Sequence, residues 1–112
     1  MNDYFGSEKH HWFKAIDAGY DVWFNNFRGT RYSLGHVDYD YAGNDAETYW
    51  SYTFAEMGIY DAPAAIQKIY EENGGQKIDL INQSNATTAM HYGLAYGDLE
   101  ETFFADRLNK VI

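Results

Sequence analysis

A serine between a short apolar segment and an alternating small and apolar segment is best placed to do chemistry in this sequence. Ser84 lies in the stretch LINQSNATTAM, Leu80 to Met90. A strand, a tight turn with serine at its tip and a helix make a nucleophile elbow, usually spelled G-x-S-x-G, in which the serine hydroxyl attacks a carbonyl. The glycines accommodate a strained backbone and a close approach of strand and helix. Asn82 and Ala86 occupy these positions, so we expect the turn to form with strain.

A second interpretation gives this serine no chemical role. Serine is a favoured N-cap residue, and Ser84 directly precedes a predicted helix. Short motifs often match by chance. The local sequence alone therefore favours a capping role.

Attack by a serine hydroxyl needs a general base within hydrogen-bond reach. In an elbow of this type, the acid and then the base follow the serine along the chain. The only later histidine is His91, in the same predicted helix, about 10 Å along the axis from Ser84 at ~1.5 Å per residue. Asp98 and Asp106 follow, but no histidine follows them. We therefore expect that a catalytic triad cannot close within this chain.

The elements that must position the serine are a strand before it and a helix after it. Residues 77–81 match a short apolar strand, and residues 85–96 match a helix that Gly97 closes. A further helix is expected from Asp61, as N-cap, with Pro63 in its first turn; it ends at Gly74-Gly75. Apolar residues recur at helical spacing in both: Ala62, Ala65, Ile66, Ile69 and Tyr70 in one, and Ala86, Ala89, Met90, Gly93 and Leu94 in the other.

The rest of the chain also alternates between helical and strand patterns. The predicted elements are a helix at 7–18 with Ser7 as N-cap and Gly19 as its stop, a strand at 20–24, a loop at 25–45, short helical turns at 49–60, and a strand start at 110–112. Such alternation predicts an α/β fold with a parallel sheet. We expect a single partial domain over residues 1–112, with parallel strands, flanking helices and an incomplete sheet.

Length and composition limit the number of domains and disfavour several kinds of partner and site. The 112 residues allow one domain at most, and 46% hydrophobic residues supply a core. A net charge of −9 disfavours nucleic acid and anionic membranes as partners. There is no cysteine for a disulfide or thiolate metal site, and we expect no cofactor. The start MNDY does not predict a signal peptide, so the compartment is unknown, and no apolar run of about 18 residues predicts a membrane span.

Two patterns resemble metal sites. The stretch EKHH at residues 8–11 contains three potential ligands, but adjacent helix positions do not face one another. Residues 38–49 begin like a calcium loop, yet the fifth and twelfth positions hold Ala42 and Tyr49, and a bidentate Glu is needed at the twelfth. We therefore expect no metal site.

Two further patterns favour structural interpretations. Asn82 and Asn85 each begin an N-x-[ST] pattern. Because the turn should be tucked between strand and helix, we expect both to be chance matches. Arg28 could touch a ligand or fix the loop by pairing with Asp38 or Asp40, and we expect the loop role.

Several spaced blocks follow one another in an order typical of a known family. They are DAGYDVW at 17–23, NFRGT at 26–30, YWSY at 49–52, EM at 56–57, YDAPA at 60–64 and INQSNATT at 81–88. Over about residues 8–112 the chain resembles the acid lipases, the gastric and lysosomal lipases among the α/β-hydrolases. The resemblance implies a partial α/β-hydrolase fold. It also implies hydrolysis of neutral lipid esters, triacylglycerols or cholesteryl esters, through an acyl-serine intermediate.

The resemblance also implies roles at the turn. Ser84 matches the nucleophile, and Asn85 matches the residue whose backbone N–H forms half of the oxyanion hole. Asn82 and Ala86 replace the family's two glycines, while Gln83 and Asn85 replace its histidine and glutamine. The loop spelled HGLL, which supplies the other half of the hole, has no counterpart in this sequence.

In the family's sheet, the HGLL strand lies between the strands that residues 20–24 and 77–81 resemble. Without it these two strands must pair directly or leave exposed edges, because a gap of about 10 Å is twice the ~4.8 Å strand spacing. We therefore expect the isolated chain to be marginally stable or insoluble. Two hypotheses remain: a piece of a lipase-like serine hydrolase, inactive as an isolated chain, or a degenerate, non-catalytic module with a binding or structural role. A lipid ester is the implied partner, and no protein partner is predicted.

Overall fold

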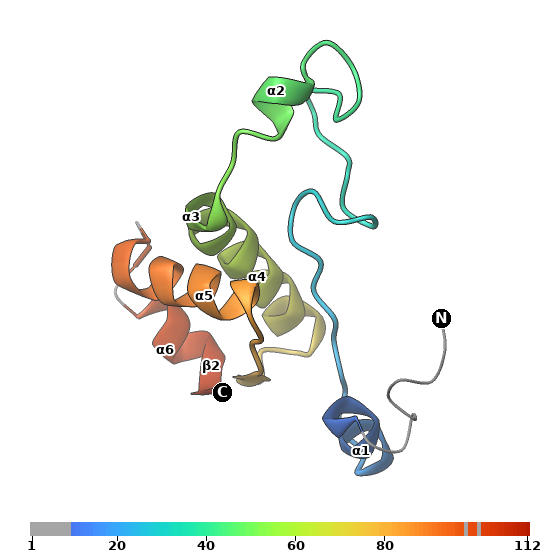
Figure 1. Ribbon diagram of the computed structural model, residues 1–112. Helices are drawn as coiled ribbons and strands as arrows, with labels where there is room; N and C mark the ends of the chain where they lie inside the picture. Colours follow the sequence, from blue (N-terminus) through green and yellow to red (C-terminus); the bar gives the residue numbers. More distant parts are fainter. Residues whose placement is uncertain (1–9, 98, 101) are drawn as a thin grey trace.

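The computed structural model describes residues 10–97, 99–100 and 102–112, so the predicted cap Ser7 lies outside the described residues. The elements are α1 (His11–Asp17), α2 (Ala46–Tyr49), α3 (Phe54–Glu56), the π-helical turn η2 (Met57–Asp61), α4 (Ala62–Glu72), β1 (Ile78–Leu80), α5 (Asn85–Tyr96), α6 (Phe103–Arg107) and β2 (Leu108–Val111). Figure 1 shows α3 to α6 gathered in one cluster, with α1 and α2 apart from it. None of the described helices combines the length and apolar character needed to cross a membrane.

The sheet within the described residues consists of two parallel strands, β1 and β2. Ile78 lies opposite Leu108, and Leu80 lies opposite Val111. The chain between the strands forms α5 and α6, so a helical crossover joins them as parallel pairing requires. This arrangement of helices and a two-stranded parallel sheet is compatible with the predicted partial α/β fold, and the serine turn follows β1.

The predicted strand at residues 20–24 is wrong. The segment is not assigned to a strand, and its Tyr20 and Phe24 side chains are 67% and 66% exposed. Aromatic and β-branched residues favour strands only where a neighbouring strand completes the hydrogen-bond ladder. β1 pairs with β2 instead, so direct pairing of 20–24 with 77–81 does not occur and the segment is left exposed.

The helix before β1, α4, begins at Ala62, directly after Asp61 and with Pro63 in its first turn, as predicted. Asp61 itself has helical dihedrals, φ −71° and ψ −45°, and makes no side-chain cap, because helical turns precede it. These turns begin at Phe54, where Thr53 accepts a hydrogen bond from the Ala55 N–H (3.1 Å) and Glu56 accepts one from the Thr53 N–H (2.7 Å). This reciprocal pair is a capping box, whose T-x-x-E spelling is present in the sequence. The helix then runs through η2 into α4 without interruption.

The predicted ends of α4 and α5 are confirmed. Gly74 and Gly75 follow α4 with φ of 78° and 80°, a left-handed conformation that glycine adopts without steric cost. α5 covers residues 85–96 as predicted, and Gly97 is its C-cap. These stops fix how the chain enters β1 and leaves α5.

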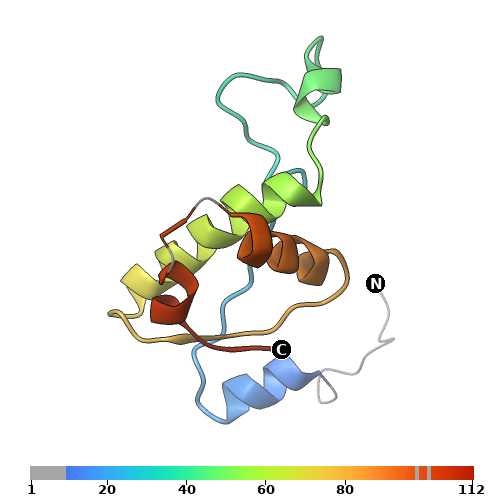
Figure 2. The same cartoon turned by 90° about the vertical axis from the view of Figure 1, so that its left-hand side faces the viewer.

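The core lies where α4, α5 and the sheet meet. The predicted faces supply it: Ala62 and Ile66 are buried on α4, and Ala89 and Met90 on α5. Leu94, expected on the same face of α5, is 45% exposed. Partly buried hydrophobic residues pack around the core cluster: Phe27, Ile78, Leu80, Phe103 and Phe104. The predicted α5 face therefore contributes mainly through its middle, where α5 lies against α3 and η2 (Figure 2).

Candidate functional site

The serine turn has a strained backbone. Ser84 has φ 56° and ψ −124°, and among the described non-glycine residues it alone has a positive φ. Its carbonyl accepts hydrogen bonds from the N–H groups of Thr87 (3.0 Å) and Thr88 (3.3 Å), which begins α5. Ser84 is an exposed residue, and its side chain makes no cap hydrogen bond. Ser84 thus occupies the N-cap position at the corner without the predicted side-chain capping.

Asn85 places a backbone donor beside the serine. It is the first residue of α5, so its N–H has no carbonyl partner within the helix. The helix N-terminus also carries partial positive charge, which favours a negatively charged oxygen nearby. Asn85 is exposed, so the expectation that the whole turn is tucked away is wrong, because no described element covers this side of the corner.

Asn82, at the first glycine position of the G-x-S-x-G pattern, affects the turn through both its backbone and its side chain. Its backbone N–H donates to the Ile112 carbonyl (2.8 Å), extending the β1–β2 pairing toward Ser84. Its side-chain Nδ2 is buried and has no hydrogen-bond partner among the described residues. An unsatisfied buried donor costs about 1–3 kcal/mol, so the corner forms with an amide that opposes its stability.

The described residues do not bring a base to the serine. His91 is exposed, and its Nδ1 lies 2.8 Å from the Thr87 carbonyl one turn earlier in α5. Because a carbonyl only accepts, Nδ1 donates and the ring is held along its own helix. Asp106 lies in α6, also exposed, and Asp98 lies outside the described residues. Within the described part, Ser84 has no hydrogen bond to His91 or Asp106.

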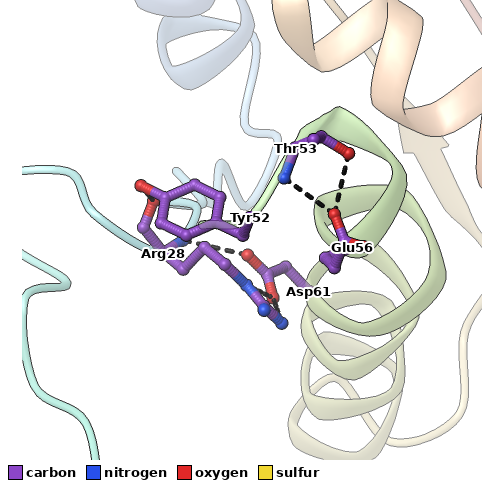
Figure 3. A network of polar contacts seen from close by, with 5 residues as sticks. All are labelled: Arg28, Tyr52, Thr53, Glu56 and Asp61. Atoms are coloured by element: carbon purple, nitrogen blue, oxygen red, sulfur yellow. Dashed lines mark hydrogen bonds and ion pairs between the residues drawn. The ribbon is translucent and has the colours of Figure 1, made fainter. Parts of the chain in front are cut away.

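Arg28 forms a polar contact of three hydrogen bonds with a distant segment of the chain, and its partner differs from the prediction. Its N–H donates to Asp61 Oδ2 (2.9 Å), while Nε (2.8 Å) and Nη2 (2.6 Å) donate to Oδ1 (Figure 3). The predicted pairing with Asp38 or Asp40 is therefore wrong. Asp61 presents two acceptor oxygens to a guanidinium and a backbone donor at once, and the side-chain hydrogen bonds that Arg28 donates to Asp61 raise the pKa of Arg28.

Tyr52 and Glu56 complete the surroundings of this ion pair. The Tyr52 hydroxyl donates to the Arg28 carbonyl (3.1 Å), and its ring centroid lies 5.8 Å from the guanidinium. Burial raises the pKa of Tyr52, whereas the hydrogen bonds from Thr53 lower the pKa of Glu56. A cavity of about 560 Å³ opens beside these residues and includes His36 in its lining. Ser84 is not part of that lining, so the ion pair and the serine occupy separate places.

The candidate metal ligands take other roles. Within the residues that the structure describes, no three His, Asp or Glu side chains form a group that could hold a metal ion. His10 stacks on Trp12 with ring centroids 4.0 Å apart, and Glu8 lies outside the described residues. Asp40 Oδ1 accepts a hydrogen bond from the Ala42 N–H (3.0 Å), so this carboxylate stabilises its own loop.

Comparison with known proteins gives the family. No family model matches the chain. Gastric triacylglycerol lipase of Rattus norvegicus is 41% identical over 76 residues, which are 68% of this chain and 18% of that lipase. Lipase lipl-3 of Caenorhabditis elegans is 34% identical over 98 residues, 88% of this chain and 23% of that lipase. A putative lysosomal acid lipase/cholesteryl ester hydrolase of Crotalus adamanteus is 33% identical over 76 residues, with shares of 68% and 18%.

The chain is an acid lipase homologue. The predicted resemblance is thereby confirmed. This acid lipase homologue spans about a fifth of the length of the curated relatives it matches, 18% and 23% of the first two named above.

Sequence reasoning missed two features of the acid lipase homologue. The capping box at Thr53 has a local signal, the T-x-x-E spelling, and could have been found. The Arg28–Asp61 pair joins residues 33 positions apart and has no local signal. The capping box begins the helical segment that contains η2, and the Arg28–Asp61 pair joins the long loop to the last residue of η2.

Proposed function

We propose that this chain supplies the nucleophile turn of a lipase-type carboxylic ester hydrolase with a partial α/β-hydrolase fold, formed as one partial domain over residues 1–112. Ser84 is the nucleophile, and the Asn85 backbone N–H is one oxyanion donor. The observation that carries the proposal is the positive φ of Ser84 at a strand-to-helix corner. Strain of about 1–3 kcal/mol at a non-glycine residue persists only where the surrounding structure holds it, and it is concentrated at functional sites.

The chemistry follows from the position of the hydroxyl. Ser84 Oγ attacks the ester carbonyl carbon, its proton passes to a base, and the carbonyl oxygen becomes an oxyanion near the Asn85 N–H. Collapse of this intermediate breaks the ester C–O bond, releases the alcohol and leaves an acyl-serine. Water then attacks the acyl carbon, and the fatty acid leaves as Ser84 regains its proton.

The substrate class rests on the relatives. Their names specify a triacylglycerol lipase and a cholesteryl ester hydrolase, and we propose neutral lipid esters of these two kinds for this chain. His91 is held along α5 by its bond to Thr87, so it does not serve Ser84 as a base. We therefore propose that the isolated chain does not turn over ester substrates.

A fluorophosphonate probe in alkaline buffer tests the nucleophile. Solvent hydroxide then replaces the missing base, so slow labelling at Ser84 is expected and Ser84→Ala should abolish it. Ser51→Ala is the matched control, because Ser51 is also exposed but its hydroxyl donates to the Thr48 carbonyl. Labelling that survives in Ser84→Ala, or no labelling at this serine, would instead favour the non-catalytic module.

A graft tests the altered elbow. Residues 81–88 of this chain would replace the matching segment of a gastric triacylglycerol lipase, which supplies the rest of its own active site. We expect a folded graft to retain measurable triacylglycerol hydrolysis, and reversion of Asn82 and Ala86 to glycine to raise it. A folded graft that stays inactive until both glycines return would show that this elbow is not competent.

A further inference from the structure

We infer that a direct backbone-to-backbone contact between η2 and α5 holds Ser84 in its strained conformation. Gly58 and Gly93 are the positioning residues of this contact. Both glycines are buried. A Cβ built on Gly58 would overlap the Ala89 carbonyl oxygen and lie 2.9 Å from the Gly93 nitrogen; one built on Gly93 would overlap the Gly58 carbonyl oxygen. The two backbones therefore touch directly, and neither can accept a methyl group without moving.

A strained turn relaxes unless the chain is fixed on both sides of it. On the side before Ser84, β1 pairs with β2 and the Asn82 N–H donates to the Ile112 carbonyl (2.8 Å). On the side after it, the contact with η2 fixes α5. Ala89 is fully buried at this contact, and it follows Ser84 by five residues, about 7.5 Å along a helix axis. The corner is thus held between two anchors.

The η2 turn is itself held in place from its other end. Asp61, its last residue, accepts the three hydrogen bonds from Arg28, as Figure 3 shows. The Phe54 and Tyr92 rings, with centroids 5.9 Å apart, add a second contact between this helix and α5. A fixed η2 gives the glycine contact a rigid surface, so α5 cannot shift or rotate to relieve the serine.

The inference deepens the proposed function and rests on it for its meaning, because a relaxed serine would no longer present its hydroxyl beside the Asn85 N–H. The backbone conformation of Ser84 can be measured without any catalytic activity. The positioning inference can therefore be tested separately from the esterase proposal. A glycine variant that relaxes Ser84 should also label more slowly with the fluorophosphonate.

The test compares backbone NMR spectra of the whole chain in three glycine variants. Gly93→Ala and Gly58→Ala introduce the overlaps described above. Gly35→Ala is the matched control, because a Cβ there meets nothing within 4 Å. We expect the 13Cα, 13Cβ and amide signals of Ser84 and Asn85 to move in the first two variants and to stay in place in the control. Unchanged Ser84 signals in a folded Gly93→Ala and a folded Gly58→Ala would overturn the inference.

A variant of the serine itself tests the inference if Gly93→Ala and Gly58→Ala both unfold. Glycine adopts positive φ without steric cost, so Ser84→Gly removes the strain and leaves the contact intact. We expect Ser84→Gly to raise the urea midpoint of unfolding, and an unchanged or lower midpoint would overturn the inference. If the wild-type chain resists the fluorophosphonate while the Ser84 signals still move in Gly93→Ala, the esterase proposal fails and the positioning inference stands.

Discussion

Replacing Asp61 with asparagine should destabilise the chain substantially. Asn keeps the shape of Asp, but one of its two terminal atoms is a donor and its charge is lost. Arg28 presents three donors to Asp61, one to Oδ2 and two to Oδ1, so at least one donor loses its acceptor in either orientation of the amide. Hydrogen bonds to charged groups contribute about 1.5–3 kcal/mol. Because the Arg28 and Asp61 side chains are 36% and 16% exposed, we expect a loss of about 2 kcal/mol, in the lower half of that range.

Urea unfolding followed by tryptophan fluorescence and far-UV circular dichroism measures this loss. With a slope of about 2 kcal/mol/M, a loss of about 2 kcal/mol lowers the midpoint by about 1 M. Glu72→Gln is the control, because it breaks the Lys68–Glu72 pair, which is exposed to solvent, and should cause no measurable shift. A shift for Asp61→Asn no larger than that of the control would refute the reasoning that this pair holds the loop on η2.

Three further outcomes are expected. Asn82→Ala removes a buried donor without a partner and should stabilise the chain by about 1–2 kcal/mol, measured by urea unfolding; destabilisation would show that this amide has a partner in solution. Glu56 has a lowered pKa because Thr53 donates to it, so its contribution is present above the unfolded Glu pKa and is lost as pH falls through the folded one. Wild type should therefore lose more stability on acidification than Glu56→Gln, and parallel pH profiles would contradict this. His91→Ala should leave the rate of fluorophosphonate labelling at Ser84 unchanged, and slower labelling, read by mass spectrometry, would show that His91 assists.

The sequence was a good guide wherever local signals decide a structure. The helix at residues 85–96 was predicted to the residue, because its ends are marked by the serine turn and by Gly97. Ile78–Leu80 lies inside the predicted strand, since its apolar run is bounded by turn residues. The serine corner was likewise expected from a strand, a short turn and a helix in succession.

The errors arose where contacts with residues distant in the chain determine the local structure. Residues 20–24 have the composition of a strand but no strand beside them, and composition alone cannot supply a ladder. Asp61 and Pro63 correctly mark the start of α4, but the Asp61 side chain binds Arg28 instead of capping the helix, and helical turns precede it. The strain at Ser84 was expected, but the contact of Gly58 with Ala89 and Gly93, which we infer holds it, joins residues far apart in the chain and follows no spacing rule.

The bonds at Ile112 bear on how readily the serine reacts. Its N–H donates to the Leu80 carbonyl and its carbonyl accepts from the Asn82 N–H, both at 2.8 Å. Ile112 therefore fixes the backbone of the segment that leads from β1 to Ser84. Deleting Ile112 would remove both bonds, whereas Ile112→Ala would keep them, because both use only the backbone. The two variants should then differ in how readily the serine reacts.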